Sequence, residues 1–428
     1  MRFVKLCLGR LLARYVRQFF RTNSHIKLVA VVGSVGKTST KSTIVDLLTT
    51  KYRVRTNRGN FNAALSAPLE ILAVESPANP RRLADWIDVV KKARMSARQH
   101  HDIDIVVQEF GIDHPGEMAQ FARYLRPDIT VVTAISPEHM EFFGNLTTVA
   151  QEEFGLSRVS RKTLYNKEDI RPEFATCATS PVVMSYGTSE EATYRMRAGT
   201  FQPGRGFACQ LTYADHASQP FVMPVIGIHQ LRIAAGAAAV ALELGVSMKM
   251  VVRSLARFRA VAGRMSILPG MKGATIIDDT YNASPLAVTS ALETLYRLPT
   301  KRKIAVLGDM NELGKMTQLE HEAIGKLCDP KKFYCVVTVG PLAQQFLAPA
   351  ATQRGCRVLS FATALQAVPT LKKLTGQDAV FLFKGSQGGI YLEEAVKPLL
   401  KNPHDASKLV RQSAEWLQRK QAFFDQKP

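Results

Sequence analysis

Residues 28–40 read LVAVVGSVGKTST, and this segment indicates the fold of the chain. A five-residue apolar run, typical of a buried strand, enters a glycine-rich turn, and residues 40–48 then space their apolar side chains like a helix. Strand, turn and helix N-terminus form a phosphate cradle, because backbone N–H groups and the helix dipole both favour an anion. Lys37 is expected to reach the terminal phosphates, and the Thr38 hydroxyl can ligate Mg²⁺. The spacing is the short form G-x-x-G-K-T, for which a plain glycine-rich turn is the alternative interpretation.

Composition limits the classes of protein to consider. A chain of 428 residues should form about two or three domains. The net charge of +20 suggests an anionic substrate, a membrane surface or nucleic acid, although a solvated basic surface needs no partner. Nucleic acid is disfavoured, because the chain has no RNP-like string and no zinc-finger spacing. The six cysteines are scattered without a C-x-x-C pair, which predicts reduced thiols in the cytoplasm, and no apolar run is long enough to cross a bilayer.

Residues 1–26 are expected to form a separate, basic amphipathic helix. Its apolar side chains share one face, and the opposite face carries Arg10, Arg14, Arg17 and Arg21. These arginines interrupt any signal-peptide core, so we exclude secretion. One interpretation is peripheral contact with an anionic surface at the inner membrane. The other, slightly favoured, is that the apolar stripe packs on the next domain.

The rest of the chain predicts two α/β domains. Strands alternate with helices between residues 27 and 262, which indicates a mostly parallel sheet in a central P-loop domain. Residues 181–227 read as β-rich sequence with frequent turns. The pattern restarts at residue 263, where we place a domain boundary. Residues 263–428 predict a smaller, doubly wound, Rossmann-like C-terminal domain.

Chemically useful side chains follow the predicted strands of the central domain. Strand 103–107 leads to Glu109, and strand 129–133 leads to Glu138 and His139. Open α/β sheets bind ligands at the carboxyl ends of their strands. A carboxylate and an imidazole beside the phosphate loop would suit metal ions that bridge phosphates.

The C-terminal domain repeats this arrangement. Asp279 and Asn282 follow the strand at 274–277, and Lys384 follows the strand at 379–383. Their common position at strand ends predicts a shared cleft.

Together these motifs resemble those of the Mur ligases, ATP-dependent enzymes that form amide bonds in peptidoglycan precursor synthesis. The resemblance covers nearly everything from residue 27 to the tail. The matching strings are GSVGKTST (33–40), GNFN (59–62), EFGIDHPGEM (109–118), SPEHMEFFGNL (136–146), GRM (263–265), IIDDTYNASP (276–285), AVLGDMNELG (305–314) and KGS (384–386). The strings IIDDTYNASP and AVLGDMNELG are the specific ones, and they indicate the members that add D-alanyl-D-alanine.

The resemblance implies an acyl-phosphate mechanism in the cytoplasm. ATP would phosphorylate a carboxylate of a muramoyl-peptide-like acceptor, with Mg²⁺ between the γ-phosphate and the carboxylate. The amine of D-alanyl-D-alanine would then attack the acyl phosphate. Activation is needed because a carboxylate is a poor electrophile.

The resemblance also implies roles for individual residues. Those expected to bind ATP are Gly33, Ser34, Gly36, Lys37, Thr38, Ser39, Arg264, Asp279 and Asn282. Those expected to hold Mg²⁺ are Thr38, Glu109, His139 and Glu153, and the catalytic set is Lys37, Glu109, His139 and Glu153. Those expected in the substrate region are Asn60, Asn62, His114, Lys384 and Ser386.

Four departures from the family pattern are visible. The D-alanyl-D-alanine-adding ligases carry a domain that grips a uridine nucleotide, whereas only residues 1–26 stand here before the P-loop strand. Glu153 aligns with the family's carbamylated lysine, whose negative charge a glutamate would supply directly; Glu152 is the alternative by one position. The family's G-x-H-N-x-x-N reads GIHQLRI at 227–233, and its KGSR reads KGSQ, with Gln387.

These departures keep two other interpretations open. One is a ligase of the same type that joins a different amino acid or peptide, as pseudomurein, polyglutamate or cyanophycin ligases do. The other is a nucleotide-binding protein with this fold and no turnover.

Overall fold

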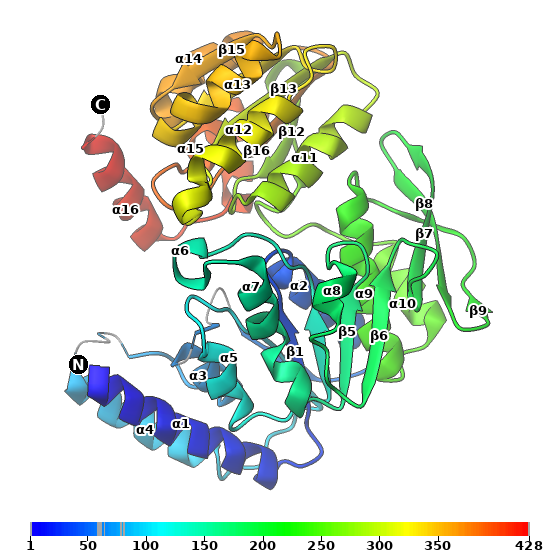
Figure 1. Ribbon diagram of the computed structural model, residues 1–428, viewed down its shortest axis with the longest axis vertical. Helices are drawn as coiled ribbons and strands as arrows, with labels where there is room; N and C mark the ends of the chain where they lie inside the picture. The colour runs from blue at the N-terminus through cyan, green and yellow to red at the C-terminus, as the bar shows by residue number, and fades with distance from the viewer. Residues whose placement is uncertain (1, 58–61, 64, 78, 80–81, 427–428) are drawn as a thin grey trace.

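A computed structural model describes residues 2–57, 62–63, 65–77, 79 and 82–426, and it contains two α/β units (Figure 1). The lower unit in Figure 1 is built on a ten-stranded sheet in the described residues, and the upper unit on a six-stranded sheet. Both sheets are mostly parallel, so the predicted fold class is confirmed. The first sheet ends with β10 (Phe221–Met223) and the second begins with β11 (Ser266–Pro269).

The larger sheet has the strand order β10-β8-β7-β6-β5-β4-β1-β3-β2, with β9 paired to β8. Neighbouring strands from β2 to β7 run parallel, and β8 pairs antiparallel with β7, β9 and β10. Its other strands are β1 (Lys27–Val32), β2 (Val54–Thr56), β3 (Ile105–Glu109), β4 (Ile129–Val132), β5 (Lys162–Asn166), β6 (Val182–Gly187), β7 (Tyr194–Gln202), β8 (Gly206–Tyr213) and β9 (His216–Ala217). The helices of this unit are α1 (Arg2–Thr22), α2 (Lys37–Leu48), α3 (Ser66–Ile71), α4 (Leu83–Ser96), α5 (Glu117–Ala122), α6 (Met140–Phe143), α7 (Leu146–Glu153), α8 (Pro172–Ala175), α9 (Ile228–Glu243) and α10 (Met248–Leu255).

The apolar run in β1 is continuous because the strand is covered on both faces. Leu28 and Val32 belong to one buried core, and Val29 and Val31 belong to the other. Alternate side chains of a strand point to opposite faces, so a strand buried on both sides needs apolar residues at every position.

The smaller sheet has the order β11-β12-β16-β13-β14-β15, and only β11 runs antiparallel to its neighbour. Its remaining strands are β12 (Thr275–Asp279), β13 (Arg302–Gly308), β14 (Cys335–Val339), β15 (Val358–Phe361) and β16 (Ala379–Lys384). Its helices are α11 (Pro285–Arg297), α12 (Thr317–Leu327), α13 (Ala348–Gln353), α14 (Ala364–Leu374), α15 (Glu393–Val396) and α16 (Ala414–Asp425).

Helix α1 packs its apolar stripe against the protein. Leu12, Val16 and Phe19 are fully buried, and α1 contacts α3 and α4, beside which it lies in Figure 1. Arg10, Arg14, Arg17 and Arg21 of this helix are exposed to solvent. The packing interpretation therefore describes this helix, and the described residues give no support to membrane contact, the less favoured interpretation. Among the described helices, none is long and apolar enough to cross a membrane.

Candidate functional site

The phosphate loop follows β1, which lies between β3 and β4 in the sheet. This position is the switch point at which crossovers leave in opposite directions and open a crevice. Gly33 has φ +118°, and an added Cβ would lie 2.3 Å from the Thr133 hydroxyl oxygen, so only glycine fits there. Gly36 has φ +89° and directly precedes α2. Helix α2 therefore begins at Lys37, three residues before the predicted start.

Lys37 is partly buried beside the loop that it follows. Its ammonium donates a hydrogen bond to the Gly33 carbonyl and lies 3.8 Å from Glu138 Oε2 and 4.0 Å from Glu153 Oε1. Burial alone would lower the pKa of Lys37, but the carboxylates of Glu138, Glu153 and Glu109 outweigh it and raise the pKa. Lys37 is therefore a permanent cation at neutral pH.

Thr38 and Glu109 form the oxygen-rich part of the site. The Thr38 hydroxyl donates to Glu109 Oε1 at 3.3 Å, and Lys41 Nζ lies 3.5 Å from Glu109 Oε2. Among the described residues, neither Glu109 Oε2 nor Glu138 Oε1 has a hydrogen-bond partner, although both atoms are buried. Hydroxyl and carboxylate oxygens are the ligands that Mg²⁺ prefers, so these residues fit such an ion.

His139 lies between the two domains. It has φ +45°, and its ring nitrogens lie 3.5 Å from Asp113 Oδ1 and 3.5 Å from Glu312 Oε2. Glu312 belongs to the C-terminal domain, so His139 marks a contact between the two units. The described residues contain no cluster of three or more His, Cys, Asp or Glu side chains suited to hold a metal. A bound Mg²⁺ would therefore need phosphate oxygens and water as further ligands.

Glu153 lies behind the phosphate loop. It is fully buried at the end of α7, and its Oε2 accepts the Gly33 N–H at 2.7 Å. Burial raises the pKa of Glu153 well above its usual range, and the nearby Glu138 carboxyl adds to this effect against the opposing charge of Lys37. The side chain lines neither of the two cavities described below, so it supports the loop from behind through its hydrogen bond with the Gly33 N–H. Its role as a metal ligand stays a prediction.

Glu152, the alternative by one position, points elsewhere. Its carboxylate accepts the backbone N–H groups of Gly116 at 2.9 Å and Met118 at 2.6 Å.

The C-terminal domain contributes a lysine that is fully buried, Lys384. Asp279 and Lys384 are register partners on neighbouring strands, β12 and β16, and Lys384 Nζ lies 2.6 Å from Asp279 Oδ2. Lys384 also donates to the Asn282 carbonyl at 3.0 Å. Burial lowers the pKa of Lys384, and the charge of Asp279 opposes this shift.

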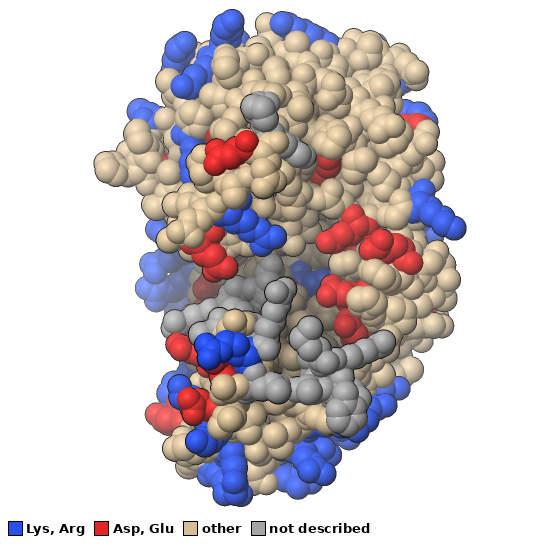
Figure 2. Space-filling model, turned by 90° about the vertical axis from the view of Figure 1, so that its left-hand side faces the viewer, with Lys and Arg blue, Asp and Glu red and all other residues tan. Residues whose placement is uncertain are grey.

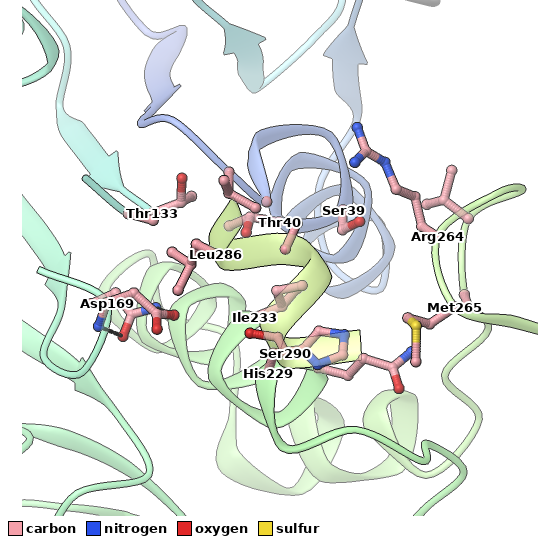
Figure 3. A pocket seen from close by; sticks show the side chains of 18 of the residues that line it. Ser39, Thr40, Thr133, Asp169, His229, Ile233, Arg264, Met265, Leu286 and Ser290 are labelled. Atoms are coloured by element: carbon pink, nitrogen blue, oxygen red, sulfur yellow. Dashed lines mark hydrogen bonds between the residues drawn. The ribbon is translucent and has the colours of Figure 1, made fainter. Parts of the chain in front are cut away.

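Two cavities meet at the phosphate loop, and both lie between the domains. The apolar cavity is lined by the start of α2, by α9 and by residues of the C-terminal domain (Figure 3). Its labelled residues are Ser39, Thr40, Thr133, Asp169, His229, Ile233, Arg264, Met265, Leu286 and Ser290. The polar cavity lies on the other side of the loop, and its polar and charged lining includes Ser34, Lys37, Thr38, Asn62, Glu109, His139, Arg264, Tyr281, Asn282, Ser284, Asn311 and Gln387.

Arg264 lines both cavities, and its guanidinium lies 4.1 Å from the centroid of the Tyr281 ring. Acidic side chains gather around the middle of the face shown in Figure 2, where the two domains meet. The structure thus brings the P-loop residues, Glu109, His139 and Asn282 to one crevice.

The predicted substrate residues are less uniform. Asn62 lines the polar cavity, and Asn60 lies outside the described residues. His114 packs against Phe142, with ring centroids 4.2 Å apart, and lines neither cavity. Ser386 is buried, and its hydroxyl accepts the Asn311 N–H at 2.9 Å, so it joins two loops instead of facing the crevice.

The departure at 227–233 has a structural counterpart. Gln230 Oε1 accepts the backbone N–H groups of Ile226 at 3.2 Å and Gly227 at 3.1 Å, so this amide caps α9. Ile233 presents an apolar side chain to the apolar cavity. Burial lowers the pKa of His229 to about 4, which keeps its ring neutral at physiological pH.

Sequence reasoning did not find Asp169, which lines the apolar cavity from the loop after β5. Asp169 accepts from Arg232 at 2.6 Å and from Asn166 at 2.7 Å. The string NKED at 166–169, directly after an apolar strand, is the signal that points to it.

Comparison with known proteins agrees with this geometry. The Mur ligase middle domain matches residues 31–241, and the Mur ligase glutamate ligase domain matches residues 263–387. The chain therefore belongs to the Mur ligase family, a class of ATP-dependent ligases.

Several similar proteins carry the same name. The UDP-N-acetylmuramoyl-tripeptide--D-alanyl-D-alanine ligase of Bacillus subtilis (strain 168) is 28% identical over 385 residues, which cover 88% of this chain and 76% of the relative. A crystal structure of MurF from Acinetobacter baumannii has a TM-score of 0.76 at 25% identity, covering 93% of this chain and 80% of that one. MurF from Thermotoga maritima, in complex with ADP, has the same fold, with a TM-score of 0.75 at 23% identity over 91% of this chain and 82% of that one.

Proposed function

We propose that this protein joins D-alanyl-D-alanine to a carboxylate of a muramoyl-peptide precursor, with ATP as the activating substrate. The observation that carries the proposal is the polar cavity, which is lined by Lys37 and Thr38 from the central domain and by Asn282 and Ser284 from the C-terminal domain. A phosphate on the loop would thus face the second domain across a space where an acceptor and an amine can meet. The names of the curated relatives support this choice of substrates.

The two cavities suggest where ATP binds. Its phosphates would lie on the loop N–H groups and near Lys37, at the N-terminus of α2. The nucleoside would lie in the apolar cavity, next to His229 and Asp279. Arg264 lines both cavities and would therefore meet the nucleotide where the two spaces join.

Mg²⁺ would be held by Thr38 and Glu109, with His139 as a further ligand. When bound, it supplies positive charge that reduces the repulsion between the γ-phosphate and the acceptor carboxylate. Lys37 adds a fixed cation to the same region, and the Glu138 carboxylate lies 3.8 Å from it.

The reaction would proceed in two steps. An acceptor carboxylate oxygen forms a bond to the γ-phosphorus, and the bond to ADP breaks. The dipeptide amine then bonds to the acyl carbon, the bond from that carbon to the phosphate oxygen breaks, and the amine loses a proton. The product is an amide, with ADP and phosphate released. The proposal places the protein in the cytoplasm, where ATP is available, and its six thiols are free.

A ligase of this type with a different amine is the second candidate. Gln387 lines the polar cavity and is uncharged. This side chain therefore brings no positive charge to the carboxylate of an incoming dipeptide.

Phosphate release from ATP and Mg²⁺ tests the proposal. D-alanyl-D-alanine and a UDP-muramoyl-tripeptide are added singly and together, with Lys37→Ala as the inactive control. Release that requires both substrates supports the proposal. Release with the dipeptide only when a truncated or lipid-linked acceptor is supplied changes the acceptor, and release with other amino acids supports the second candidate. A protein that binds ATP and releases no phosphate with any pair contradicts ligase activity.

A further inference from the structure

The loop that follows β12 brings much of the C-terminal domain's chemistry to the crevice. Tyr281, Asn282 and Ser284 line the polar cavity, and Asp279 lines the apolar cavity. The carbonyl groups of Thr280 and Tyr281 accept hydrogen bonds from Arg411. The conformation of this loop decides where Asn282 meets the nucleotide.

Arg411 holds that loop from a distant part of the chain. Its Nη2 donates to the Thr280 carbonyl at 2.7 Å, and its Nη1 donates to the Tyr281 carbonyl at 3.0 Å. These contacts join positions 131 and 130 residues apart in sequence. A planar guanidinium presents its donors in a fixed geometry, so two neighbouring carbonyls bound to it are fixed relative to each other.

A buried carboxylate fixes the guanidinium in turn. Arg411 Nε and Nη2 each donate to Glu393 at 2.7 Å, and these two side chains are 5% and 0% exposed. Paired hydrogen bonds between arginine and a carboxylate are strong and directional. Arg411 itself has φ +56°, a left-handed conformation that is uncommon for a residue with a side chain.

A second cation shares this carboxylate without contacting the loop. Lys420 of α16 lies 3.4 Å from Glu393 Oε1 and also pairs with Glu394. Both Arg411 and Lys420 therefore neutralise Glu393, but of these two cations only Arg411 donates hydrogen bonds to the carbonyls of Thr280 and Tyr281. Variants at Arg411 and at Lys420 can therefore distinguish a role in neutralising Glu393 from a role in positioning the loop.

We propose that Arg411 is a positioning residue that sets the 280–284 loop for nucleotide binding, with Glu393 as its anchor. The inference rests on the proposed function only in that the crevice binds ATP. It assigns a role in the nucleotide site to a segment of the chain that lies outside the region matched by the family domains.

The test compares three variants of the full-length protein. Arg411→Lys keeps the positive charge beside Glu393 but loses the paired hydrogen bonds to the carbonyls of Thr280 and Tyr281. Glu393→Asp keeps the charge pair and withdraws the guanidinium by about one methylene. Lys420→Met removes the second cation beside Glu393 and leaves the hydrogen bonds of Arg411 to the loop intact. Thermal unfolding reports stability, and calorimetry with a non-hydrolysable ATP analogue and Mg²⁺ reports affinity.

We expect Arg411→Lys and Glu393→Asp to weaken analogue binding by about 10- to 100-fold, because small displacements of binding groups have effects of this size. Lys420→Met should lower the unfolding temperature and change the affinity by less than about 2-fold. In turnover assays the loss for Arg411→Lys should appear mainly as a raised KM for ATP.

Several results would overturn the proposal. One is analogue binding by folded Arg411→Lys with wild-type affinity, and another is an equal loss in Lys420→Met, which would indicate charge balance alone. If Arg411→Lys does not fold, Glu393→Asp decides in the same way. If the wild-type protein binds no analogue, the proposed function itself is contradicted. This outcome is distinct from a failure of the proposal for Arg411, which requires analogue binding by the wild type.

Discussion

One lysine from each domain lines the crevice, and their surroundings differ: Lys37 is partly buried, whereas Lys384 is fully buried. Lys37 follows β1 and faces the carboxylates of Glu138 and Glu153, at 3.8 and 4.0 Å. Lys384 ends β16 and pairs with the single carboxylate of Asp279, at 2.6 Å. The pKa of Lys37 is raised because several carboxylates outweigh its burial, whereas burial lowers the pKa of Lys384 in spite of Asp279.

The central domain therefore forms an acidic side of the crevice. The C-terminal domain forms a side on which a lysine and a carboxylate neutralise each other. The central domain has more carboxyl groups than cations around its phosphate loop, and one oxygen each of Glu109, Glu138 and Glu153 lacks a hydrogen-bond partner among the described residues. Such a site needs a further cation before it can accept phosphates. The C-terminal domain pairs its charges internally and presents a preformed surface.

The largest effect should come from removing the cation of the acidic side. Lys37→Ala is expected to lower turnover by about 10²- to 10³-fold, the usual cost of losing one charged group that stabilises a transition state. Phosphate release at saturating ATP and Mg²⁺ measures it. Lys51→Ala, which removes an exposed lysine that donates to the Gly245 carbonyl, is the control. A loss of less than about 10-fold would contradict the role given to Lys37.

Removing the other lysine should affect stability more than chemistry. Lys384→Met leaves the buried Asp279 carboxylate unpaired, which is expected to cost about 3 kcal/mol of unfolding free energy. Urea unfolding with and without Mg²⁺ measures it, and the loss should be the same in both. If Mg²⁺ restored the stability of Lys384→Met, the C-terminal domain would also bind a cation, and the proposed difference between the two domains would be wrong.

Asp278 tests whether burial of a carboxyl group in the C-terminal domain lowers the free energy of unfolding at neutral pH. Burial raises the pKa of Asp278 to about 6. Because this folded-state pKa lies above the unfolded value, its protonated form stabilises the fold below about pH 4, and that contribution is lost as pH rises through 6. Relative to Asp278→Asn, the wild type should therefore lose about 2 kcal/mol between pH 4 and pH 7 in urea unfolding. If the unfolding free energies of the two proteins changed in parallel with pH, the raised pKa of Asp278 would be refuted.

The smallest effect is expected at Glu153. Because the pKa of Glu153 is raised well above its usual range, glutamine resembles its protonated form and still accepts the Gly33 N–H. Glu153→Gln should change turnover by less than about 5-fold, whereas Glu153→Ala leaves a buried N–H unpaired and should cost about 1–3 kcal/mol of stability. A Mg²⁺ requirement that rises about 10-fold in Glu153→Gln would instead favour the metal-ligand role.

The sequence predicted the parts of the site that depend on topology. Glu109 and Asp279 end parallel strands, and such ends meet at one edge of a sheet whatever the details of packing. It could not predict which way a side chain faces within a helix or loop. Glu153 was expected at the metal site and lies behind the phosphate loop, and Ser386 was expected near substrate and is buried between two loops.

Contacts between distant segments were also beyond sequence reasoning. Glu312 approaches His139 only because the two domains meet there, and Arg411 reaches Tyr281 across 130 residues. Each of these contacts depends on the relative placement of elements, which hydrophobic periodicity does not encode.

The packing of α1 determines how the N-terminal segment can be studied. Leu12, Val16 and Phe19 lie in the same buried core as Leu28 of the phosphate-loop strand. A protein truncated to begin at Lys27 would expose the apolar partners of that helix on α3 and α4 and would be prone to aggregate. Deleting the helix would therefore confuse a loss of folding with a loss of binding to any anionic surface. Changing Arg14 and Arg17 to glutamine, on the exposed face, alters the charge while leaving the core intact.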